Sequence, residues 1–232
     1  MILLRRFLPQ PLPTSHGERL RVSIGAVLGV ALTGLVSTAW LGPNGDLPLL
    51  IAPMGASAVL LFGMPASPLA QPWSIIAGNL VAALIGVSAA QWIASPLIAA
   101  AIAVGCALAA MSMLRCVHPP GGAVALTAVL GGPHIAALGY GFVLVPVGIN
   151  SVLLSLVAIV YNNVTGRSYP HRAHVPVHPH PPIAPLALNP ADFDEVLADY
   201  GEGVDISRDD LEALFQELLG RAQRQSMQRG TQ

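Results

Sequence analysis

Charged side chains are scarce in this chain: Asp, Glu, Lys and Arg together make up 10% of its 232 residues, and lysine is absent. From Val22 to Gly166, a stretch of 145 residues, the only charged side chains are Asp46 and Arg115. A soluble domain of that length needs solvated faces rich in such residues, whereas the hydrocarbon core of a bilayer excludes them. The sequence therefore predicts an integral membrane domain.

Aromatic residues and cysteines are also few. Aromatic residues make up 5% of the chain, while 53% of it is hydrophobic and 23 residues are glycine. Small side chains let membrane helices approach closely, so this composition predicts a tightly packed, all-α helix bundle. The two cysteines, Cys106 and Cys116, lie in or at the end of apolar segments and are interpreted as packing residues rather than a disulfide. The net charge of -1 gives no indication of nucleic-acid binding.

Proline and glycine breaks divide the membrane domain into six apolar segments. Four are long enough to span a bilayer, which takes about 20 apolar residues, and two are shorter. Their order of long, short, long occurs twice and suggests an internal repeat of three plus three segments. The long segments are predicted at residues 22–41, 73–93, 97–115 and 136–161, and the short ones at 49–63 and 120–132.

The relation between the two halves depends on the short segments. The first short segment opens with Pro53-Met-Gly-Ala-Ser-Ala58, and the long segment after it contains Asn79. The second opens with Pro119-Pro-Gly-Gly-Ala-Val124, and the long segment after it contains Asn150. If the short segments span, the second half is inverted relative to the first; if they are re-entrant, the halves are parallel. With a basic N-terminus in the cytoplasm, six crossings place Arg115 on the cytoplasmic side, as the positive-inside rule favours. Six crossings are therefore the preferred interpretation.

The fragment Arg115-Cys-Val-His-Pro-Pro-Gly-Gly-Ala123 ends one helix and begins another. Two successive prolines cannot continue a helix but suit the first turn of a new one, which is predicted to start near Pro119 or Pro120. Gly121 and Gly122 would leave its opening turn without side-chain cover. Open N–H groups at the positive end of a helix dipole predict an anion site here.

Other polar groups are predicted to lie on the same path. A second short helix follows Pro53, with Gly55 and Ser57 in its opening turn, and paired half-helices with N-termini at the bilayer midplane recur in carriers of small polar solutes. His118 and Arg115 would add donors and positive charge, since histidine is the side chain whose charge changes near neutral pH. The predicted substrate-binding residues are His118, Arg115, Pro119, Pro120, Gly121, Gly122, Pro53, Gly55, Ser57, Asn79 and Asn150.

Each of these residues also has a structural interpretation. The Pro-Pro-Gly-Gly run also fits a kinked connection between helices. Arg115 fits a helix-end residue that reaches the interface, and Asn79 and Asn150 fit hydrogen bonds between helices. Ser57 fits a bond to its own helix backbone. No enzyme activity is expected, because His118 has no Asp or Glu within the membrane to orient it. No cofactor is expected either, and the histidines at 171, 174, 178 and 180 are interpreted as part of a linker rather than a metal site, because no Cys or carboxylate lies at ligand spacing.

These fragments resemble the signature of the HPP family of integral membrane proteins, which is named for the sequence found here at His118-Pro-Pro120. Ile51-Ala-Pro-Met-Gly-Ala-Ser-Ala-Val-Leu-Leu-Phe62 and Pro72-Trp-Ser-Ile-Ile-Ala-Gly-Asn79 also match the family pattern, and the resemblance covers about residues 15–165. The family is described as having four transmembrane helices, and plant and cyanobacterial members are associated with nitrite transport. The resemblance therefore implies a small inorganic anion such as nitrite as the solute, without indicating which residues bind it.

The C-terminal part of the chain differs in composition from the membrane domain. A Pro- and His-rich stretch at 164–188 is predicted to be a linker, and 189–232 a short helical tail with an apolar stripe from Leu211 to Leu219. Many bacterial relatives continue after a similar segment into nucleotide-binding CBS domains. This chain ends at Gln232, so nucleotide regulation is not expected. The stripe either pairs with a second copy, giving a homo-oligomer, or packs on the membrane domain.

The expected protein is a multi-pass protein of the bacterial inner membrane with both termini in the cytoplasm. Its N-terminal segment is predicted at 1–21 and its transmembrane domain at 22–163. The predicted function is a transporter or channel for a small inorganic anion, with nitrite preferred. The alternative is a membrane anchor or sensor whose tail binds a partner or dimerises. The lipid bilayer and a small anion are the expected partners, and nucleic acid is not.

Overall fold

The computed structural model describes residues 15–41, 50–171 and 210–219, and the regular structure in these ranges is helical. Asp46 lies outside the described residues, as do the linker from residue 172 onward and all of the predicted tail except residues 210–219. The prediction of an all-α membrane bundle with four long and two short segments is confirmed.

Four stretches of helix are long and apolar enough to cross a membrane. Helix α2 spans His16–Leu41, α4 spans Pro72–Trp92 and α5 spans Pro96–Met113. The last stretch joins a kinked segment, η2 (Val143–Gly148), in which Val145 has a non-helical backbone, to α8 (Ile149–Val164). Both α4 and α5 begin with proline, whose fixed φ suits the first turn of a helix and whose missing N–H would have no partner there.

The two short segments are helices of 11 residues each, α3 (Pro53–Gly63) and α6 (Pro120–Leu130). At 1.5 Å per residue, such a helix is about 16 Å long, roughly half of the hydrocarbon thickness of a bilayer. Each begins with proline, and the residues before them, Ala52 and Pro119, have nearly the same backbone, with φ of -51° and -52°. The two halves of the domain therefore open their short helices in the same way.

The last long segment begins later than predicted. The sequence predicts one helix over residues 136–161, but Pro133–Leu138 forms a separate short helix, α7. Gly139 ends α7 with a φ of 51°, a left-handed conformation that favours glycine and stops a helix. The membrane-crossing stretch then runs over Val143–Val164.

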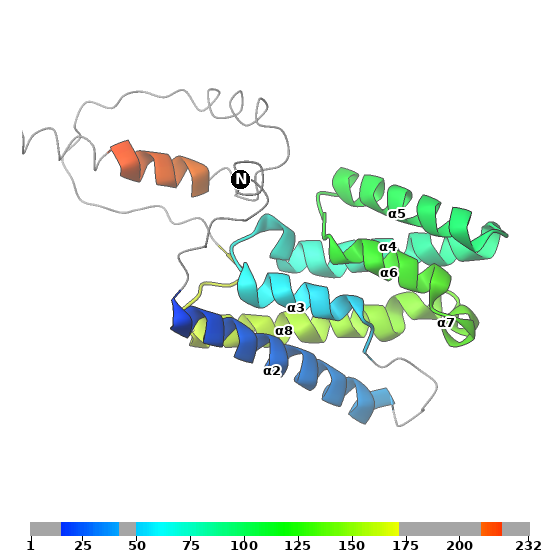
Figure 1. The fold of residues 1–232 in the computed structure, drawn as a ribbon, viewed down its shortest axis with the longest axis horizontal. Coiled ribbons are helices and arrows are strands. Elements are labelled where there is room, and N and C mark those ends of the chain that lie inside the picture. The colour runs from blue at the N-terminus through cyan, green and yellow to red at the C-terminus, as the bar shows by residue number, and fades with distance from the viewer. Residues whose placement is uncertain (1–14, 42–49, 172–209, 220–232) are drawn as a thin grey trace, which may run out of the picture.

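The main helices pack as two groups, α2 with α3 and α8, and α4 with α5 and α6 (Figure 1). Each group combines the first two helices of one half with the third helix of the other half. The two halves are thus equivalent in their packing: α2, α3 and α4 make the same kinds of contact as α5, α6 and α8. The third helices of the two halves, α4 and α8, contact each other where the groups meet. Successive helices run in opposite directions, so α2 and α5 are opposed (Figure 1). This is the inverted relation that the sequence associates with six crossings.

Small residues make the contacts within each group close. A Cβ on Gly86 of α4 would lie 2.7 Å from Ala125 O of α6, and one on Gly25 of α2 would lie 2.6 Å from the ring of Phe62 in α3. Neither distance is compatible with a side chain, so these glycines are needed for the approach itself. Membrane helices pack in this way because burial of apolar surface gives little driving force in lipid.

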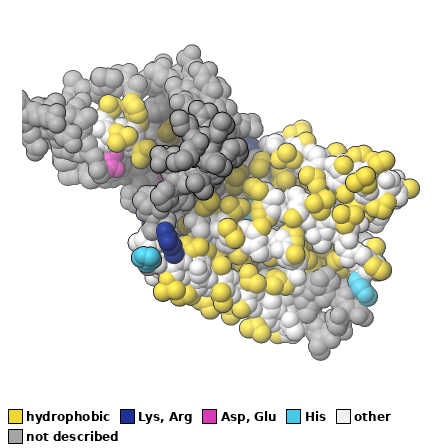
Figure 2. Space-filling view, in the orientation of Figure 1, with side chains coloured by type: hydrophobic (Ala, Val, Ile, Leu, Met, Phe, Trp, Pro, Cys, Tyr) yellow, Lys and Arg dark blue, Asp and Glu magenta, His cyan; other side chains and the backbone are white. Residues whose placement is uncertain are grey.

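Hydrophobic side chains cover the outside of the bundle (Figure 2). Trp92 and Leu97 are both 80% exposed, and Met113 is 85% exposed. An apolar surface of this extent is unfavourable in water but is well solvated by lipid tails. The long helices therefore contact the lipid bilayer.

Polar contacts tie the ends of α2, α3 and α8 together. Arg21 donates hydrogen bonds to Glu18 at 2.8 Å, to Asn162 Oδ1 at 2.9 Å and to Phe62 O at 2.9 Å. The last bond satisfies a carbonyl at the C-terminal end of α3, where carbonyls lack helical partners and positive charge is favourable. Arg167, which follows α8, also pairs with Glu18 at 2.8 Å.

The segment that follows α8 packs against the helix bundle. Tyr169 is buried, and its hydroxyl donates to Ala70 O at 2.7 Å in the short helix η1 (Pro68–Ala70). Burial raises the pKa of the Tyr169 hydroxyl, because the charged form would lose its hydration. Residues 165–171, which the sequence assigns to the linker, thus include a segment that packs against the membrane domain.

Candidate functional site

A buried polar cluster lies where the two groups of helices meet. Every side chain in it has an exposed fraction of 0%. Polar groups are costly in an apolar interior unless they are hydrogen-bonded, so their contacts carry information about the site. The cluster consists of Ser37 of α2, Ser57 of α3, Asn79 of α4, His118 before α6, and Asn150 and Ser151 of α8.

His118 joins the opening turn of α3 to the start of α6. Its Nε2 lies 2.8 Å from Ser57 Oγ, and its Nδ1 lies 2.9 Å from Leu69 O. A carbonyl only accepts, so Nδ1 carries a proton, and in the neutral ring Nε2 accepts from the Ser57 hydroxyl. Both ring nitrogens have partners, which hold the imidazole in one orientation.

Ser57 has a second acceptor close by. Its Oγ lies 3.4 Å from Pro53 O, one turn earlier, which is longer than an ordinary hydroxyl hydrogen bond. A hydroxyl has one proton and donates it to one acceptor at a time. When His118 is also protonated at Nε2, Ser57 accepts from the histidine and turns its proton toward Pro53 O. The neutral and the protonated histidine therefore both find partners here.

Asn150 bonds three helices together. Its Oδ1 accepts from Ile51 N at 3.1 Å, just before α3, and its Nδ2 donates to Ser37 Oγ of α2 at 3.1 Å. The bond to Ile51 satisfies a backbone donor that precedes α3. Asn150 thus forms hydrogen bonds between helices, as its structural interpretation predicts.

Asn79 occupies the matching place in the other half. It is the eighth residue of α4, as Asn150 is the eighth residue of Val143–Val164. Asn79 Nδ2 donates to Ser151 Oγ at 3.0 Å, but its buried Oδ1 has no hydrogen-bond partner. Such an atom costs about 1–3 kcal/mol. A serine hydroxyl can donate as well as accept. The Asn79 amide can therefore rotate so that its Oδ1 accepts from Ser151 and its NH2 group takes the place of the unpartnered oxygen.

The backbone N–H groups that open α3 and α6 are already bonded. In α3, the N–H groups of Met54 and Gly55 bond to carbonyls three residues earlier, both at 3.0 Å. In α6, those of Gly121 and Gly122 do the same at 2.8 and 3.1 Å. The helical backbone of the preceding residue creates a tight first turn that uses these donors. The prediction of open N–H groups at these termini is therefore wrong for this conformation, and the polar groups left in the cluster are side chains.

Arg115 lies outside the cluster, with an exposed side chain. Its φ is 52°, its N–H bonds to Ser112 O at 3.2 Å, and Cys116 N bonds to Met111 O at 2.9 Å. These bonds form a Schellman ending of α5 in which arginine takes the place usual for glycine. The structure therefore places Arg115 at a helix end with an exposed side chain, whereas His118 and Ser57 are buried.

The prolines and glycines of the predicted site supply backbone shape rather than polar side chains. Their exposure differs because α3 and α6 each turn one face outward. Pro53, Pro120 and Gly121 are buried, Gly122 is half-buried, and Gly55 and Pro119 are exposed.

The hydroxyls of α2 and α8 are not among the residues predicted from the sequence. Ser37 and Ser151 complete the bonds of the two asparagines, and Thr33, also fully buried, has an Oγ1 without a partner. Thr33 and Ser37 are four residues apart and so share one face of α2. Two hydroxyls at this spacing in an apolar helix are the sequence signal that would have indicated which face of α2 contacts the cluster.

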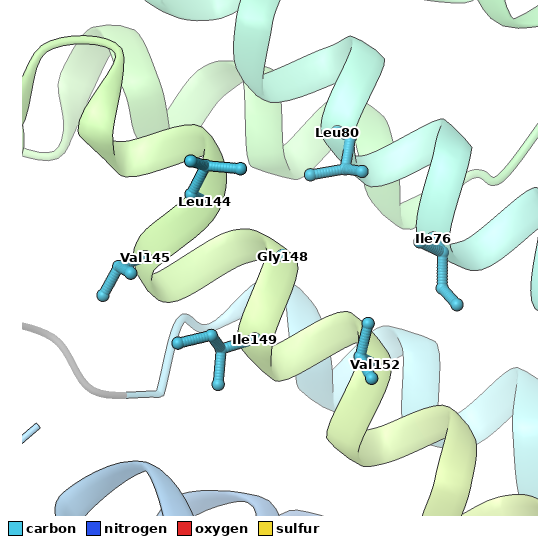
Figure 3. Close-up of a pocket in the computed structure, with 7 residues that line it drawn as sticks. All are labelled: Ile76, Leu80, Leu144, Val145, Gly148, Ile149 and Val152. Carbon is cyan, nitrogen blue, oxygen red and sulfur yellow. The ribbon is translucent and has the colours of Figure 1, made fainter. Parts of the chain in front are cut away.

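An open apolar groove lies next to the cluster along the chain, between α4 and the η2–α8 stretch (Figure 3). Its volume is about 400 Å³. Leu80 and Ile149, two of its residues, directly follow Asn79 and directly precede Asn150. Its lining is aliphatic, so it suits a lipid tail and offers an anion no partner. The lining residues are Ile76, Leu80, Leu144, Val145, Gly148, Ile149 and Val152.

Comparison with known proteins shows where this arrangement belongs. The family model for the HPP transmembrane region matches residues 11–170, which contain the whole cluster. The chain belongs to the HPP transmembrane family. The resemblance of its His-Pro-Pro fragment to the family signature is thereby confirmed, and the protein is a multi-pass membrane protein.

Two similar proteins are transmembrane proteins of Dictyostelium discoideum. One is 38% identical over 126 residues, which make up 52% of this chain and 40% of the relative. The other is 37% identical over 132 residues, which make up 55% of this chain and 46% of the relative. The chain thus spans less than half the length of either relative. No solved structure matches the chain.

Proposed function

We propose that the protein is a transporter for a small inorganic anion, nitrite by preference, and that it has no catalytic activity. The observation that supports this most is the contact of 2.8 Å between His118 Nε2 and Ser57 Oγ. It joins the opening ends of two half-length helices that enter the bundle from opposite directions. Inverted-repeat carriers place their substrate sites between such ends.

The chemistry of the cluster suits an anion. Its hydroxyl, amide and imidazole groups can all donate hydrogen bonds, and among the described residues Glu18, near the start of α2, is the one acidic side chain before residue 210. Within the described part of the chain, no carboxylate therefore repels an anion at the cluster. Removing such an ion from water costs on the order of tens of kcal/mol by idealised estimate, which several convergent donors must offset.

The cluster is closed in this conformation. Because its side chains are fully buried, an anion reaches them only when the two groups of helices move apart. The contacts between the groups include Ser57 with His118 and Asn79 with Ser151. We propose that these contacts open toward one side of the membrane and then the other, as the inverted arrangement of the halves permits.

Uptake of nitrite into proteoliposomes containing the full chain tests this function, with nitrate, formate and chloride as competitors. Saturable nitrite uptake above that of protein-free vesicles is expected. Asn79→Ala is expected to reduce the rate at least about tenfold, since it removes one donor at the meeting point. The matched control is Gln91→Ala, an exposed amide in the same helix. Uptake no greater than in protein-free vesicles, with folded protein, would refute the proposal.

We also propose the orientation and location given by the sequence. Arg21, Arg115 and Arg167 lie toward the end of the bundle where α2 begins and α5 and α8 end. The positive-inside rule puts this end, and hence both termini, in the cytoplasm of a bacterial cell with the protein in its inner membrane. An impermeant thiol reagent is expected to label Arg115→Cys, with the native cysteines replaced, only in inside-out vesicles.

A second candidate function has its own support in the helix of residues 210–219. Leu214 and Leu218 on this helix are 52% and 56% exposed, and His171 Nε2 lies 2.9 Å from Asp210 Oδ1 near its start. An exposed apolar stripe favours a partner or a second copy, in a membrane anchor or sensor. Truncation after His171 separates the candidates, because a transporter retains nitrite uptake whereas an anchor loses its docking element.

A further inference from the structure

We infer that anion transport by this protein is coupled to protons, with His118 carrying one proton for each anion. The inference rests on the proposed function and specifies its substrate as a monovalent anion together with H⁺. Three observations lead to it: the lack of any other positive charge at the cluster, the arrangement of partners around the imidazole, and the occupied backbone donors at the two helix ends.

Among the described residues, no other positive side chain is bonded to the cluster, since Arg21 of α2 bonds to Glu18, Asn162 and Phe62 O instead. Helices α3, η1, α4 and α6, which surround His118, contain no titratable side chain. Cys116, two residues away, and Tyr169, which bonds next to Leu69 at Ala70 O, are uncharged near neutral pH. Arg115 is exposed and ends α5. An anion at the cluster is therefore compensated only when His118 is protonated.

The groups around His118 can form hydrogen bonds with both the neutral and the protonated imidazole. Leu69 O holds the proton on Nδ1, at 2.9 Å, so the proton that comes and goes is the one on Nε2. Ser57 donates to Nε2 in the neutral ring, and in the protonated ring it accepts from Nε2 and turns to Pro53 O. Proton binding therefore needs the rotation of one hydroxyl and leaves the imidazole in place.

Occupied backbone donors make this charge necessary. The N–H groups of Gly121 and Gly122 and their counterparts in α3 bond within the chain, so the helix ends contribute no free donors. An imidazolium alone, or an anion alone, is unfavourable in this apolar interior. The two together form a neutral pair, so proton and anion each increase the affinity of the site for the other.

The transport step balances in atoms and charge. A proton from water on the entry side binds the lone pair of His118 Nε2, and the anion binds beside it. On the exit side the anion leaves and Nε2 returns the proton to water, while no bond within the anion changes. One H⁺ and one monovalent anion cross together, with no net charge moved.

Proteoliposomes with a pH dye in the lumen test the coupling with nitrite as the probe. Protein-free vesicles give the background from diffusion of nitrous acid, which is subtracted. We expect the initial rate of nitrite uptake to rise with an inward proton gradient, to be accompanied by one proton per nitrite, and to be unchanged by a potassium–valinomycin potential. Uptake that follows the potential and ignores the proton gradient would overturn the coupling and leave the transport function standing. No uptake in any arm would refute the transport function itself, and the coupling with it.

His118→Gln tests the residue, because glutamine keeps hydrogen-bonding capacity but does not titrate. Proton-driven nitrite uptake is expected to disappear in His118→Gln and to persist in His134→Gln, a matched change at an exposed histidine of α7. A folded His118→Gln protein that still moves one proton per nitrite would overturn the assignment.

Ser57→Ala provides an independent test with the histidine still present. It removes the acceptor of the protonated Nε2, so proton-driven uptake is expected to fall about tenfold. Ser23→Ala, at an exposed serine bonded to its own helix at Arg19 O, is the matched control and is expected to leave uptake unchanged. Equal uptake by the two variants would contradict the role of Ser57 as the partner of the protonated ring.

Discussion

Gly78 and His118 lie so close that a Cβ on Gly78 would be 2.9 Å from His118 Cβ and 2.6 Å from Cys116 O. The backbone of α4 therefore supports the start of α6 directly. The position of the imidazole depends on the absence of a side chain at residue 78.

Gly78→Ala is expected to destabilise the protein by about 1–3 kcal/mol, because neither the backbone carbonyl nor the histidine can yield without shifting the loop. Thermal unfolding in detergent measures the change. Gly105→Ala is the matched control in α5, where an added Cβ meets nothing within 4 Å. That change is expected to be neutral or to stabilise by up to about 1 kcal/mol through helix propensity. Similar unfolding temperatures for the two variants would contradict the close approach.

The two asparagines are expected to separate stability from transport. Asn150→Leu leaves Ile51 N and Ser37 without their partner and is expected to destabilise by about 2–4 kcal/mol. Asn79→Leu loses one bond but also removes an unpartnered buried oxygen, so its cost is expected to be smaller. Nitrite uptake by the Asn79→Leu protein is nevertheless expected to be strongly reduced. An Asn79→Leu protein as unstable as Asn150→Leu would contradict this difference.

Arg115→Gly is expected to stabilise the protein by about 1 kcal/mol, since glycine adopts the φ of 52° at the end of α5 without strain. Because the side chain of Arg115 is exposed and the cluster is buried, nitrite uptake is expected to be unchanged. The pair Arg115→Gly and Arg115→Ala distinguishes the backbone effect from the loss of charge, with stabilisation expected for glycine alone. A large loss of uptake in both would place Arg115 on the transport path.

Arg21→Gln is expected to cost about 2–3 kcal/mol, because it removes the charged donor that bonds Glu18, Asn162 and the end of α3. Arg167→Gln is the control: its arginine is 52% exposed and pairs only across the surface with Glu18, which is worth at most about 1 kcal/mol. Thermal unfolding of the two variants side by side checks the ranking. The reverse order would show that the bond to the α3 carbonyl contributes little.

The positions of the helices could be predicted from the sequence because prolines mark their beginnings. Pro53, Pro72, Pro96 and Pro120 each open a helix in the structure, within a residue or so of the expected place. The start of the last long helix was harder to predict. Gly139 acts there through its backbone angle, in a run that is apolar on both sides.

The interior of the site was less predictable for a physical reason. His118, Ser57, Asn79 and Asn150 are recognisable as rare polar residues in an apolar chain. Which of them touch depends on pairings between distant positions, such as Ser57 and His118, which are 61 positions apart in the sequence. The bonding of the helix-opening N–H groups depends on the φ and ψ of Ala52 and Pro119, which residue type alone does not determine.

The exchange of third helices between the two halves has a consequence for biosynthesis. When α4 emerges from the ribosome, its packing partners α5 and α6 have not been made, and α2 and α3 wait in the same way for α8. Neither half completes its interfaces before the last helix has been inserted. Two fragments divided between Trp92 and Pro96 are therefore expected to be degraded when produced singly and to assemble when produced together. The group of α4, α5 and α6 can pack first, and completion of the domain waits for α8.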